Sequence, residues 1–553
     1  MTTFTSVADM VRVRADDDRL AIVSSEGSLT YREWVQCCAD RAALWTSIAD
    51  PQRPPHIGVL LDNVAEFTMW LGAAALVGAT VVGINPTRRG EQLAHDVRHT
   101  ECQMVVTNAG YQPVLAGLDL GLDLGLGADR LVDLGGPQFA AALDRYRGAP
   151  LPTAPVAAET QYLLLFTSGT SGTPKAVICT QGRLAFVCGA MIGVVGLDAN
   201  DVTYVSMPLF HSNALFTGWG PSVAAGATVA LRAKFSATEF MPDVRRFGAT
   251  YFNYVGKPLA YVLATPEQPD DRDHTLTRGF GNEANDADLT RFADRFGCRL
   301  IDGYGQTETG ASIVRVPDMP AGALGVAAPT VQILDPATGD ECVRARFGEG
   351  GRLLNAAAAT GEIVNTAGTS FEGYWKNPEA NAERLRSGAY WTGDLGYRDE
   401  AGFFYFAGRN ADWLRVDGEN FAAAPIERIL ARFPGVVLGA VYAVPDPCVG
   451  DRVMVAMELT GGAVFDPEAF TDFLAAQPDL GPKWGPAFVR IVSELPLTQT
   501  NKVLKRELVA QRWGCADPVW VVTPDGGYRP FTAADAANLA AEFRHHGRAA
   551  LVD

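Results

Sequence analysis

The sequence lacks the features that define several classes of protein. Its nine cysteines are scattered along 553 residues without a CxxC spacing, which excludes a zinc ribbon, a thioredoxin site and a small disulfide scaffold. Scattered thiols are typical of a reducing compartment, so we predict a cytoplasmic location. The N-terminus has no apolar region typical of a signal peptide. The longest apolar run, residues 69–84, contains three glycines and is short for a bilayer span.

The sequence also lacks an excess of basic residues. Lysine and arginine total 46, aspartate and glutamate total 63, and the formal net charge is −17. Such an acidic chain is a poor candidate for non-specific binding to nucleic acid or to an anionic membrane. We therefore expect that any anionic ligand binds in a local pocket built from backbone amides and a few cations.

Apolar strand-like runs alternate with helical patterns along most of the chain, which predicts a layered α/β fold. The strand candidates are 162–166, 202–208, 227–231, 249–255 and 299–302. Thr30 and Glu33 form a capping-box pattern at the start of a predicted helix. Near Arg409 the pattern changes to a smaller α+β unit. We predict a large N-terminal body (1–409), a smaller mobile C-terminal domain (410–514) and a docked tail (515–553).

One loop carries the strongest chemical signal. The segment Thr167-Ser168-Gly169-Thr170-Ser171-Gly172-Thr173-Pro174-Lys175 follows the apolar run 163–166 directly. Glycines let several N–H groups converge on one anion, hydroxyls add donors, and a lysine adds a mobile charge. The segment therefore predicts a polyphosphate site, although it lacks the ending of a Walker A loop. A flexible Ser/Gly linker is the alternative, against which the preceding strand and the Pro-Lys ending argue.

Four further segments follow in order. They are Asp302-Gly303-Tyr304-Gly305-Gln306-Thr307-Glu308, Tyr390-Trp391-Thr392-Gly393-Asp394, Gly408-Arg409 with Asp417-Gly418-Glu419-Asn420, and Pro496-Leu497-Thr498-Gln499-Thr500-Asn501-Lys502. Together with the loop, they resemble the signature of the adenylate-forming superfamily of acyl-CoA synthetases, adenylation domains and firefly-type luciferases. The resemblance runs from about residue 30 to residue 506. The tail further resembles the long-chain and very-long-chain fatty-acyl-CoA synthetases.

The resemblance implies ATP or AMP, Mg²⁺ and coenzyme A as cofactors and assigns a role to each motif. It implies that Lys502 bridges the carboxylate and the α-phosphate, that Thr307 contacts the α-phosphate, and that Glu308 binds Mg²⁺. It places adenine between Tyr304 and the segment Gly281-Asn282-Glu283, with Asp302 and Gly305 beside it. The β- and γ-phosphates are assigned to Thr167, Ser168, Gly169, Thr170 and Lys175. The ribose is assigned to Asp394 and Arg409, and the pantetheine tunnel to Gly418.

Some positions keep two interpretations or depart from the family pattern. His211 is either an aromatic gate beside the carboxylate or a histidine of the core. Taken singly, Glu308, Asp394 and Lys502 also fit ordinary surface residues, and only their joint order favours a site. Ala411 stands where the family has an Asp or Lys hinge, and Asn501 stands where it has glycine.

We therefore predict an acid–thiol ligase that activates a hydrophobic acid, fatty or polycyclic, as acyl-AMP and transfers the acyl group to coenzyme A. One alternative is a ligase that performs mainly the thioester-forming half from a preformed acyl-adenylate. Another is a non-catalytic binder of acyl groups or nucleotides. Neither nucleic acid nor a transmembrane span is expected, and a homodimer is left open.

Overall fold

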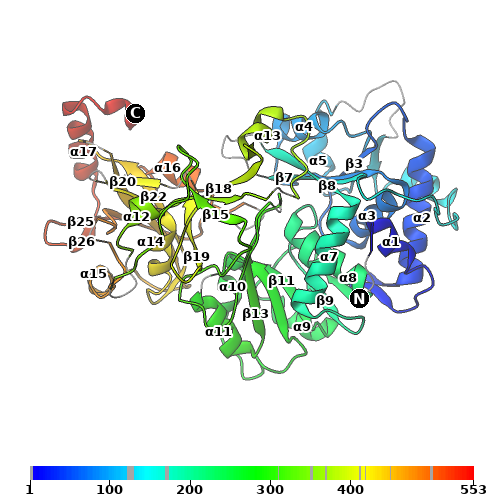
Figure 1. The fold of residues 1–553 in the computed structure, drawn as a ribbon, viewed down its shortest axis with the longest axis horizontal. Coiled ribbons are helices and arrows are strands. Elements are labelled where there is room, and N and C mark those ends of the chain that lie inside the picture. The colour runs from blue at the N-terminus through cyan, green and yellow to red at the C-terminus, as the bar shows by residue number, and fades with distance from the viewer. Residues whose placement is uncertain are drawn as a thin grey trace.

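The computed structural model describes residues 4–120, 130–167, 174–284, 286–308, 310–348, 353–367, 370–409, 413–416, 419–448, 450–481, 483–498 and 502–552. Helices and strands alternate through a large N-terminal body, and a smaller C-terminal lobe, yellow to red in Figure 1, lies at one end of it. The predicted α/β fold with a large body and a smaller C-terminal domain is therefore confirmed. The domain boundaries stay predictions.

Two largely parallel sheets form the layers of the body. The eight-stranded sheet has the order β14-β13-β12-β11-β9-β10-β1-β2, and the six-stranded sheet has the order β6-β5-β3-β4-β7-β8. The first contains β1 (Leu20–Ser24), β2 (Gly27–Thr30), β9 (Val202–Val205), β10 (Thr228–Leu231), β11 (Tyr251–Val255), β12 (Arg278–Asn282), β13 (Arg299–Tyr304) and β14 (Ile313–Val314). The second contains β3 (His56–Val59), β4 (Thr80–Gly83), β5 (Met104–Thr107), β6 (Leu131–Asp133), β7 (Gln161–Thr167) and β8 (Lys175–Thr180).

Helices fill the space around these sheets. They are α1 (Val7–Arg12), α2 (Tyr31–Ile48), α3 (Ala65–Val77), α4 (Gly90–His99), α5 (Gln112–Leu115), α6 (Pro137–Asp144), α7 (Gln181–Val195), α8 (Gly220–Ala225), α9 (Phe240–Phe247), α10 (Gly256–Leu263) and α11 (Asp286–Phe296). The capping box is confirmed, because the Thr30 side chain accepts from the Glu33 amide and Glu33 accepts from the Thr30 amide. The apolar run 69–84 forms the end of α3 and then β4.

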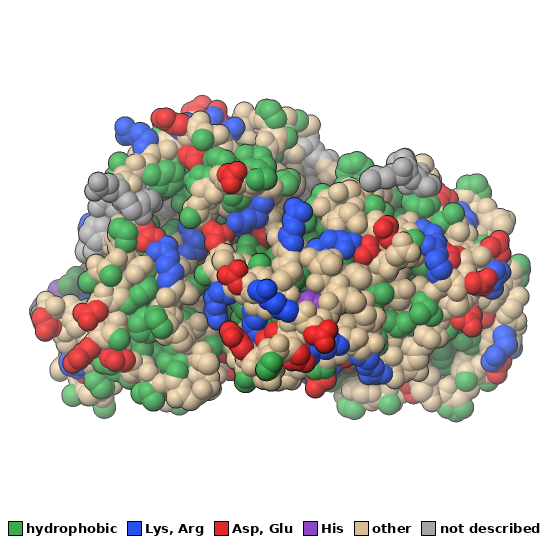
Figure 2. Space-filling model, turned by 90° about the horizontal axis from the view of Figure 1, so that it is seen from below, with side chains coloured by type: hydrophobic (Ala, Val, Ile, Leu, Met, Phe, Trp, Pro, Cys, Tyr) green, Lys and Arg blue, Asp and Glu red, His purple; other side chains and the backbone are tan. Residues whose placement is uncertain are grey.

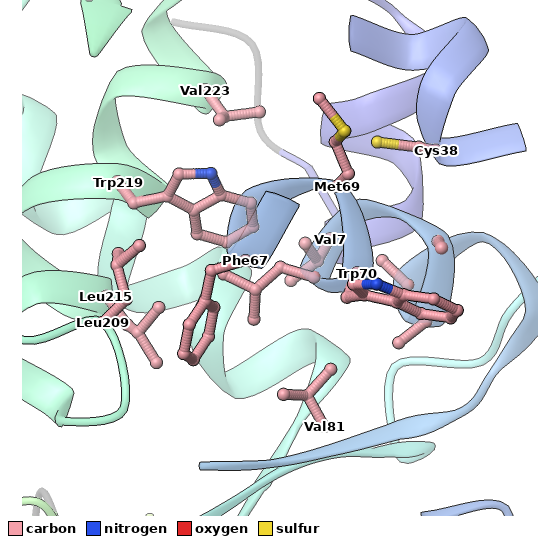
Figure 3. Close-up of a cluster of buried hydrophobic side chains, with 14 of the residues drawn as sticks. Val7, Cys38, Phe67, Met69, Trp70, Val81, Leu209, Leu215, Trp219 and Val223 are labelled. Carbon is pink, nitrogen blue, oxygen red and sulfur yellow. The ribbon is translucent and has the colours of Figure 1, made fainter. Parts of the chain in front are cut away.

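The main hydrophobic core joins elements of both sheets. Figure 3 shows Trp219 and Leu215 near Phe67 of α3, with Val81 of β4 below. Trp219 and Leu215 belong to a six-residue π-helix, η2 (Ala214–Trp219), which begins three residues after His211. Trp219, Phe67 and Trp70 are at most 1 % exposed. Burying each such side chain stabilises the fold by about 1.5–3 kcal/mol, so this core holds the segment that carries His211 firmly.

An antiparallel sheet connects the body to the C-terminal lobe. It contains β15 (Val331–Leu334), β16 (Gly361–Asn365), β17 (Leu385–Arg386), β18 (Ala389–Arg398) and β19 (Phe404–Arg409), with α12 (Ala356–Ala359) and α13 (Pro378–Arg384) nearby in the chain. In Figure 1, β18 and β19 lie between the body and the lobe. Their pairing places Asp394 opposite Arg409.

The C-terminal lobe has its own sheet and core. A hairpin of β20 (Trp413–Val416) and β21 (Glu419–Ala422) precedes a five-stranded sheet of β22 (Val436–Pro445), β23 (Asp451–Leu459), β24 (Phe488–Val492), β25 (Val519–Val522) and β26 (Tyr528–Pro530). The helices are α14 (Ala423–Leu430), α15 (Pro467–Ala475), α16 (Lys505–Gln511) and α17 (Ala533–His545). Residues of the tail therefore contribute two strands to the lobe's own sheet.

Three further observations bear on location and surface. All nine cysteines are free thiols. In the described ranges no helix is both long and apolar enough to cross a bilayer. On the face in Figure 2, lysine and arginine side chains lie among aspartate and glutamate side chains.

Candidate active site

The predicted phosphate loop joins two antiparallel strands, β7 and β8. Thr167 ends β7 and Lys175 begins β8, and these two residues are directly paired. Residues 168–173, which include Ser168, Gly169 and Thr170, lie outside the described residues. The Lys175 side chain is buried, and its Nζ lies 3.3 Å from Glu383 Oε2 and 5.4 Å from the centre of the Tyr374 ring. The positive charge is thus held at one end of the predicted phosphate loop.

Thr307 and Glu308 follow β13 and are fixed by groups from three other segments. The Thr307 hydroxyl lies 2.7 Å from the Ser212 hydroxyl, and the Arg183 guanidinium donates to the Thr307 carbonyl. Glu308 is only 7 % exposed, and its Oε1 accepts a 2.8 Å hydrogen bond from the Tyr374 hydroxyl. This hydroxyl also accepts from Arg384 Nε at 3.3 Å. Both predicted residues therefore have defined orientations.

Asp394 is the centre of a buried hydrogen-bond network. Its Oδ2 accepts from the Tyr304 hydroxyl at 2.8 Å and from Gln306 Nε2 at 2.5 Å, and the carboxylate is 3 % exposed. Gln306 Oε1 accepts in turn from the Tyr390 hydroxyl at 3.0 Å. Burial, followed by the charge of Asp394, raises the pKa of Tyr304 well above its ordinary value, so this phenol stays a donor at neutral pH. Arg409 faces Asp394 across β18 and β19, and its side chain lies outside the description.

The predicted adenine segment, residues 281–283, spans the end of β12. Gly281 is required there, because a Cβ atom at this position would lie 2.4 Å from both the Tyr254 ring and the Tyr254 carbonyl oxygen. Asn282 Nδ2 donates to the Gly303 carbonyl at 2.5 Å, which ties the end of β12 to β13. Gly305, by contrast, has open space around its Cα.

Asp302 lies next to Gly281 across β12 and β13 and is a buried carboxyl group. Its Oδ2 accepts from the Ala284 amide at 3.2 Å and from the Tyr254 hydroxyl at 3.3 Å. Burial is the main cause that raises the pKa of Asp302 to about 7. A carboxyl group that is partly protonated at neutral pH can both donate and accept hydrogen bonds.

His211, the predicted gate residue, lies three residues before η2. Its amide donates to the Pro208 carbonyl at 3.0 Å, and its ring lies 4.2 Å from the Phe210 ring, centre to centre. Burial, helped by the charge of Lys502, lowers the pKa of His211 to about 3, so the imidazole is neutral at physiological pH. Asn213 donates to the Tyr254 carbonyl at 3.0 Å and accepts from Asn253 at 2.7 Å.

Lys502 reaches the body from the C-terminal lobe. Its Nζ lies 2.6 Å from Glu283 Oε1, in an ion pair whose side chains are 40 % and 46 % exposed. Glu283 adopts a left-handed backbone with φ 66°, and its carbonyl packs so closely on Gly256 that a Cβ there would lie 2.0 Å away. The Lys502 amide donates to the Thr498 hydroxyl at 3.0 Å. Gly418, Ala411 and Asn501 lie outside the described residues.

The structure therefore brings the described candidates into connected groups. Tyr374 connects Lys175 to Glu308. Gln306 connects Tyr390 to Asp394. The charges of Glu308 and Asp394 both act on the Tyr390 hydroxyl, whose pKa is raised mainly by burial.

Sequence reasoning missed the side chains that orient these candidates. Tyr374, in the segment before α13, donates to Glu308, and Arg183 of α7 donates to the Thr307 carbonyl. Arg384 of α13 and Tyr390 of β18 act one step further away, because they donate to Tyr374 and Gln306 respectively. Tyr390 and Gln306 lie inside the recognised motifs, so their positions in the sequence could have identified them as residues of the site. Nothing in the residues around Tyr374 or Arg183 indicates such a role.

The chain belongs to the AMP-binding enzyme family. Residues 11–375 match the family described as AMP-binding enzyme, and residues 425–502 match the AMP-binding enzyme C-terminal domain. The chain is 51 % identical over 549 residues to the steroid-22-oyl-CoA synthetase of Rhodococcus jostii, covering 98 % of each chain. It is 48 % identical to the medium/long-chain-fatty-acid–CoA ligase FadD17 of Mycobacterium marinum, covering 89 % of this chain and 94 % of that one.

Solved structures show the same fold. The anthranilate CoA ligase AuaEII, crystallised with anthranoyl-AMP, superposes with a TM-score of 0.80 at 20 % identity, over 92 % of this chain and 97 % of that one. ATP-bound MatB from Rhodopseudomonas palustris superposes with a TM-score of 0.77 at 23 % identity, over 91 % and 98 %. The predicted membership in the adenylate-forming enzymes is confirmed by the family match and these folds.

Proposed function

We propose that this chain is an acyl-CoA synthetase that activates a hydrophobic carboxylic acid with ATP and transfers the acyl group to coenzyme A. The observation that carries the proposal is the convergence of Lys175, Glu308 and Asp394, with Lys502 reaching the same region from the other domain. The relatives named as CoA synthetases and ligases support the reaction class.

In the first half-reaction, a carboxylate oxygen attacks the α-phosphorus of ATP, the bond from that phosphorus to the pyrophosphate oxygen breaks, and acyl-AMP forms. Two anions must approach each other, so charge neutralisation and alignment dominate the barrier. Lys175 holds the β- and γ-phosphates together with the loop of which it forms the end. Lys502, which its ion pair with Glu283 holds at the body, bridges the carboxylate and the α-phosphate, and Thr307 donates to the α-phosphate.

The nucleoside is held by groups that are already organised. Asp394 binds the ribose hydroxyls, and its carboxylate is fixed for this by Tyr304 and Gln306. The adenine lies between Tyr304 and residues 281–283, where Gly281 leaves no side chain in the way. Arg409, Asp302 and Gly305 complete this part of the site.

A divalent cation fits the donor set at Glu308. No group of three or more His, Cys, Asp or Glu side chains able to hold a metal occurs in the part of the chain that the structure describes. Mg²⁺ needs no such group, because it is usually held by one or two carboxylates, by water and by substrate phosphates. Glu308 is the carboxylate that would hold it, and the ion would neutralise charge on the phosphates.

In the second half-reaction, the thiol sulfur of coenzyme A attacks the acyl carbon, and AMP leaves with the electron pair of the broken C–O bond. The C-terminal domain rotates about residues 409–411, which withdraws Lys502 and brings Gly418 to the pantetheine tunnel. Adenylate is a good leaving group, so this step depends on positioning more than on a strong base. A domain rotation lets one chain perform both steps at one carbonyl.

The acid is fatty or polycyclic. The relative at 51 % identity is named for a steroid-22-oyl substrate and that at 48 % for medium- and long-chain fatty acids. Of these two, the greater identity favours a steroid side-chain acid. His211, kept neutral by its surroundings, faces the carboxylate as an uncharged ring.

One set of assays on the full chain separates three candidate functions. It uses ATP, Mg²⁺, coenzyme A and a panel of steroid and fatty acids, and in parallel a supplied acyl-adenylate. A full ligase releases pyrophosphate with its preferred acid and loses this release in Lys502→Ala. An enzyme limited to the thioester-forming half makes acyl-CoA only from supplied acyl-adenylate. A non-catalytic binder gives neither product with any acid.

Location and assembly are part of the same proposal. The nine free thiols support a cytoplasmic location, since disulfides are rare in that compartment. A homodimer stays a prediction, for which light scattering on the purified chain is the measurement.

A further inference from the structure

We propose that Tyr374 is a positioning residue that orients Lys175 and Glu308 toward the same triphosphate. Its hydroxyl holds Glu308, and its ring face holds Lys175. The inference rests on the proposed function, because it takes these two residues as ligands of the phosphates and the cation. The residue lies outside every motif that indicated the site, in the segment between β16 and α13.

The hydroxyl of Tyr374 orients the Glu308 carboxylate. It donates to Glu308 Oε1 at 2.8 Å, and both side chains are buried, at 2 % and 7 % exposure. Arg384 Nε donates to the same hydroxyl at 3.3 Å, so the phenolic proton is directed toward the carboxylate. The carboxylate oxygen that faces Tyr374 is thereby fixed.

The ring of Tyr374 orients the Lys175 ammonium. Lys175 Nζ lies 5.4 Å from the ring centre, within the range of a cation–π contact. Lys175 is only 8 % exposed, so little water competes with this contact. The ammonium also pairs with Glu383, whose side chain is 71 % exposed and easily displaced by a phosphate.

Tyr374 is itself held rigidly against the strand that carries Lys175. Its backbone forms an antiparallel bridge with Val177 of β8, and the next amide, of Trp375, donates to the Ala176 carbonyl at 2.8 Å. The Tyr374 amide donates to Asn381 Oδ1 at 2.7 Å. The aromatic ring of Phe371 packs against it at 4.9 Å, centre to centre. A rigid tyrosine that touches two charged groups fixes the distance between them.

The test compares Tyr374→Phe with wild type and with a matched control. Tyr204→Phe is the control, because Tyr204 also donates to a buried carboxylate, Asp243, at 3.0 Å, with an arginine beside it. Calorimetry measures the binding of ATP with Mg²⁺ or Mn²⁺, and electron paramagnetic resonance measures bound Mn²⁺. The rate of acyl-AMP formation is measured as a function of Mg²⁺ concentration. Melting temperatures report any loss of folding.

Loss of one hydrogen bond to a charged group changes a binding constant about tenfold or more. We expect Tyr374→Phe to weaken cation binding in the presence of ATP about tenfold and to raise the half-saturating Mg²⁺ concentration equally, with the KM for the acid unchanged. Tyr374→Leu also removes the ring, and ATP binding weakens a further two- to fivefold. Tyr204→Phe leaves the cation and ATP affinities at the wild-type values.

Three results overturn the inference. One is an unchanged cation affinity in Tyr374→Phe. Another is an equal loss of cation affinity in Tyr374→Phe and Tyr204→Phe. The third is a rate loss in Tyr374→Phe with unchanged Mg²⁺ dependence. Failure of the proposed function is distinct, because then the wild-type chain itself forms no acyl-AMP from any acid.

Discussion

Replacement of Glu283 by glutamine removes the negative charge that pairs with Lys502 across the two domains. The pair is 2.6 Å long, and both side chains are nearly half exposed. Ion pairs of this kind contribute about 0.2–1 kcal/mol, because water screens them. If the pair favours the orientation in which Lys502 faces the nucleotide, its loss lowers the population of that orientation about 1.4- to 5-fold relative to others.

The two half-reactions are measured separately to detect this shift. Formation of acyl-AMP is followed in the absence of coenzyme A, and acyl-CoA formation is followed from supplied acyl-AMP. We expect Glu283→Gln to slow the first by about 1.4- to 5-fold and to leave the second unchanged or faster. Near 1 M salt the screening length falls to about 3 Å, so wild type and variant then converge.

Asp479→Asn is the matched control for this prediction. Asp479 pairs with Arg432 at 2.5 Å, and both residues belong to the C-terminal lobe, so this pair does not span the domains. Its variant keeps the wild-type ratio of the two half-reaction rates. A loss of adenylation rate in Glu283→Gln much above tenfold, or one that persists in high salt, contradicts this prediction. Glu283 would then have a chemical rather than a positional role.

Three further predictions concern single positions. Gly281→Ala places a methyl group 2.4 Å from the Tyr254 ring, so we expect a loss of about 1–3 kcal/mol in the free energy of unfolding, and an unchanged denaturation midpoint contradicts this. His211 has a pKa of about 3 in the fold and about 6.5 when unfolded, so the unfolded chain takes up a proton first as the pH falls. The free energy of unfolding therefore falls below pH 6.5, by about 2 kcal/mol at pH 5. In urea titrations His211→Asn lacks this fall, and an equal pH dependence of wild type and variant contradicts the prediction. Glu383→Gln frees Lys175 from an exposed carboxylate, so we expect the Kd for ATP, measured by calorimetry, to fall up to about fivefold. Weaker ATP binding in the variant contradicts this, because Glu383 then contributes to the site itself.

Local sequence signals predicted those parts of the structure that local physics decides. Thr30 and Glu33 cap α2 as their spacing indicated. The strand expected at 202–208 is shorter, Val202–Val205, because the next residues turn toward η2.

Long-range contacts lay beyond such signals. The hydroxyl of Tyr374 meets Glu308 across 66 positions of sequence, and Arg183 meets the Thr307 carbonyl across 124. No periodicity or composition reports such a pairing, because it is set by how the sheets pack. The π-helix at 214–219 is likewise a result of tertiary packing around Trp219 rather than of residue preference.

The proposed function requires that a carboxylate oxygen of a hydrophobic acid becomes bonded to the α-phosphorus of ATP in this site. A single turnover with a steroid side-chain or fatty acid labelled with ¹⁸O in its carboxylate, followed by mass spectrometry of the released AMP, tests it most directly. We expect AMP that carries one ¹⁸O, together with acyl-CoA. Acyl-CoA formed with unlabelled AMP, or from ATP cleaved to ADP, contradicts it.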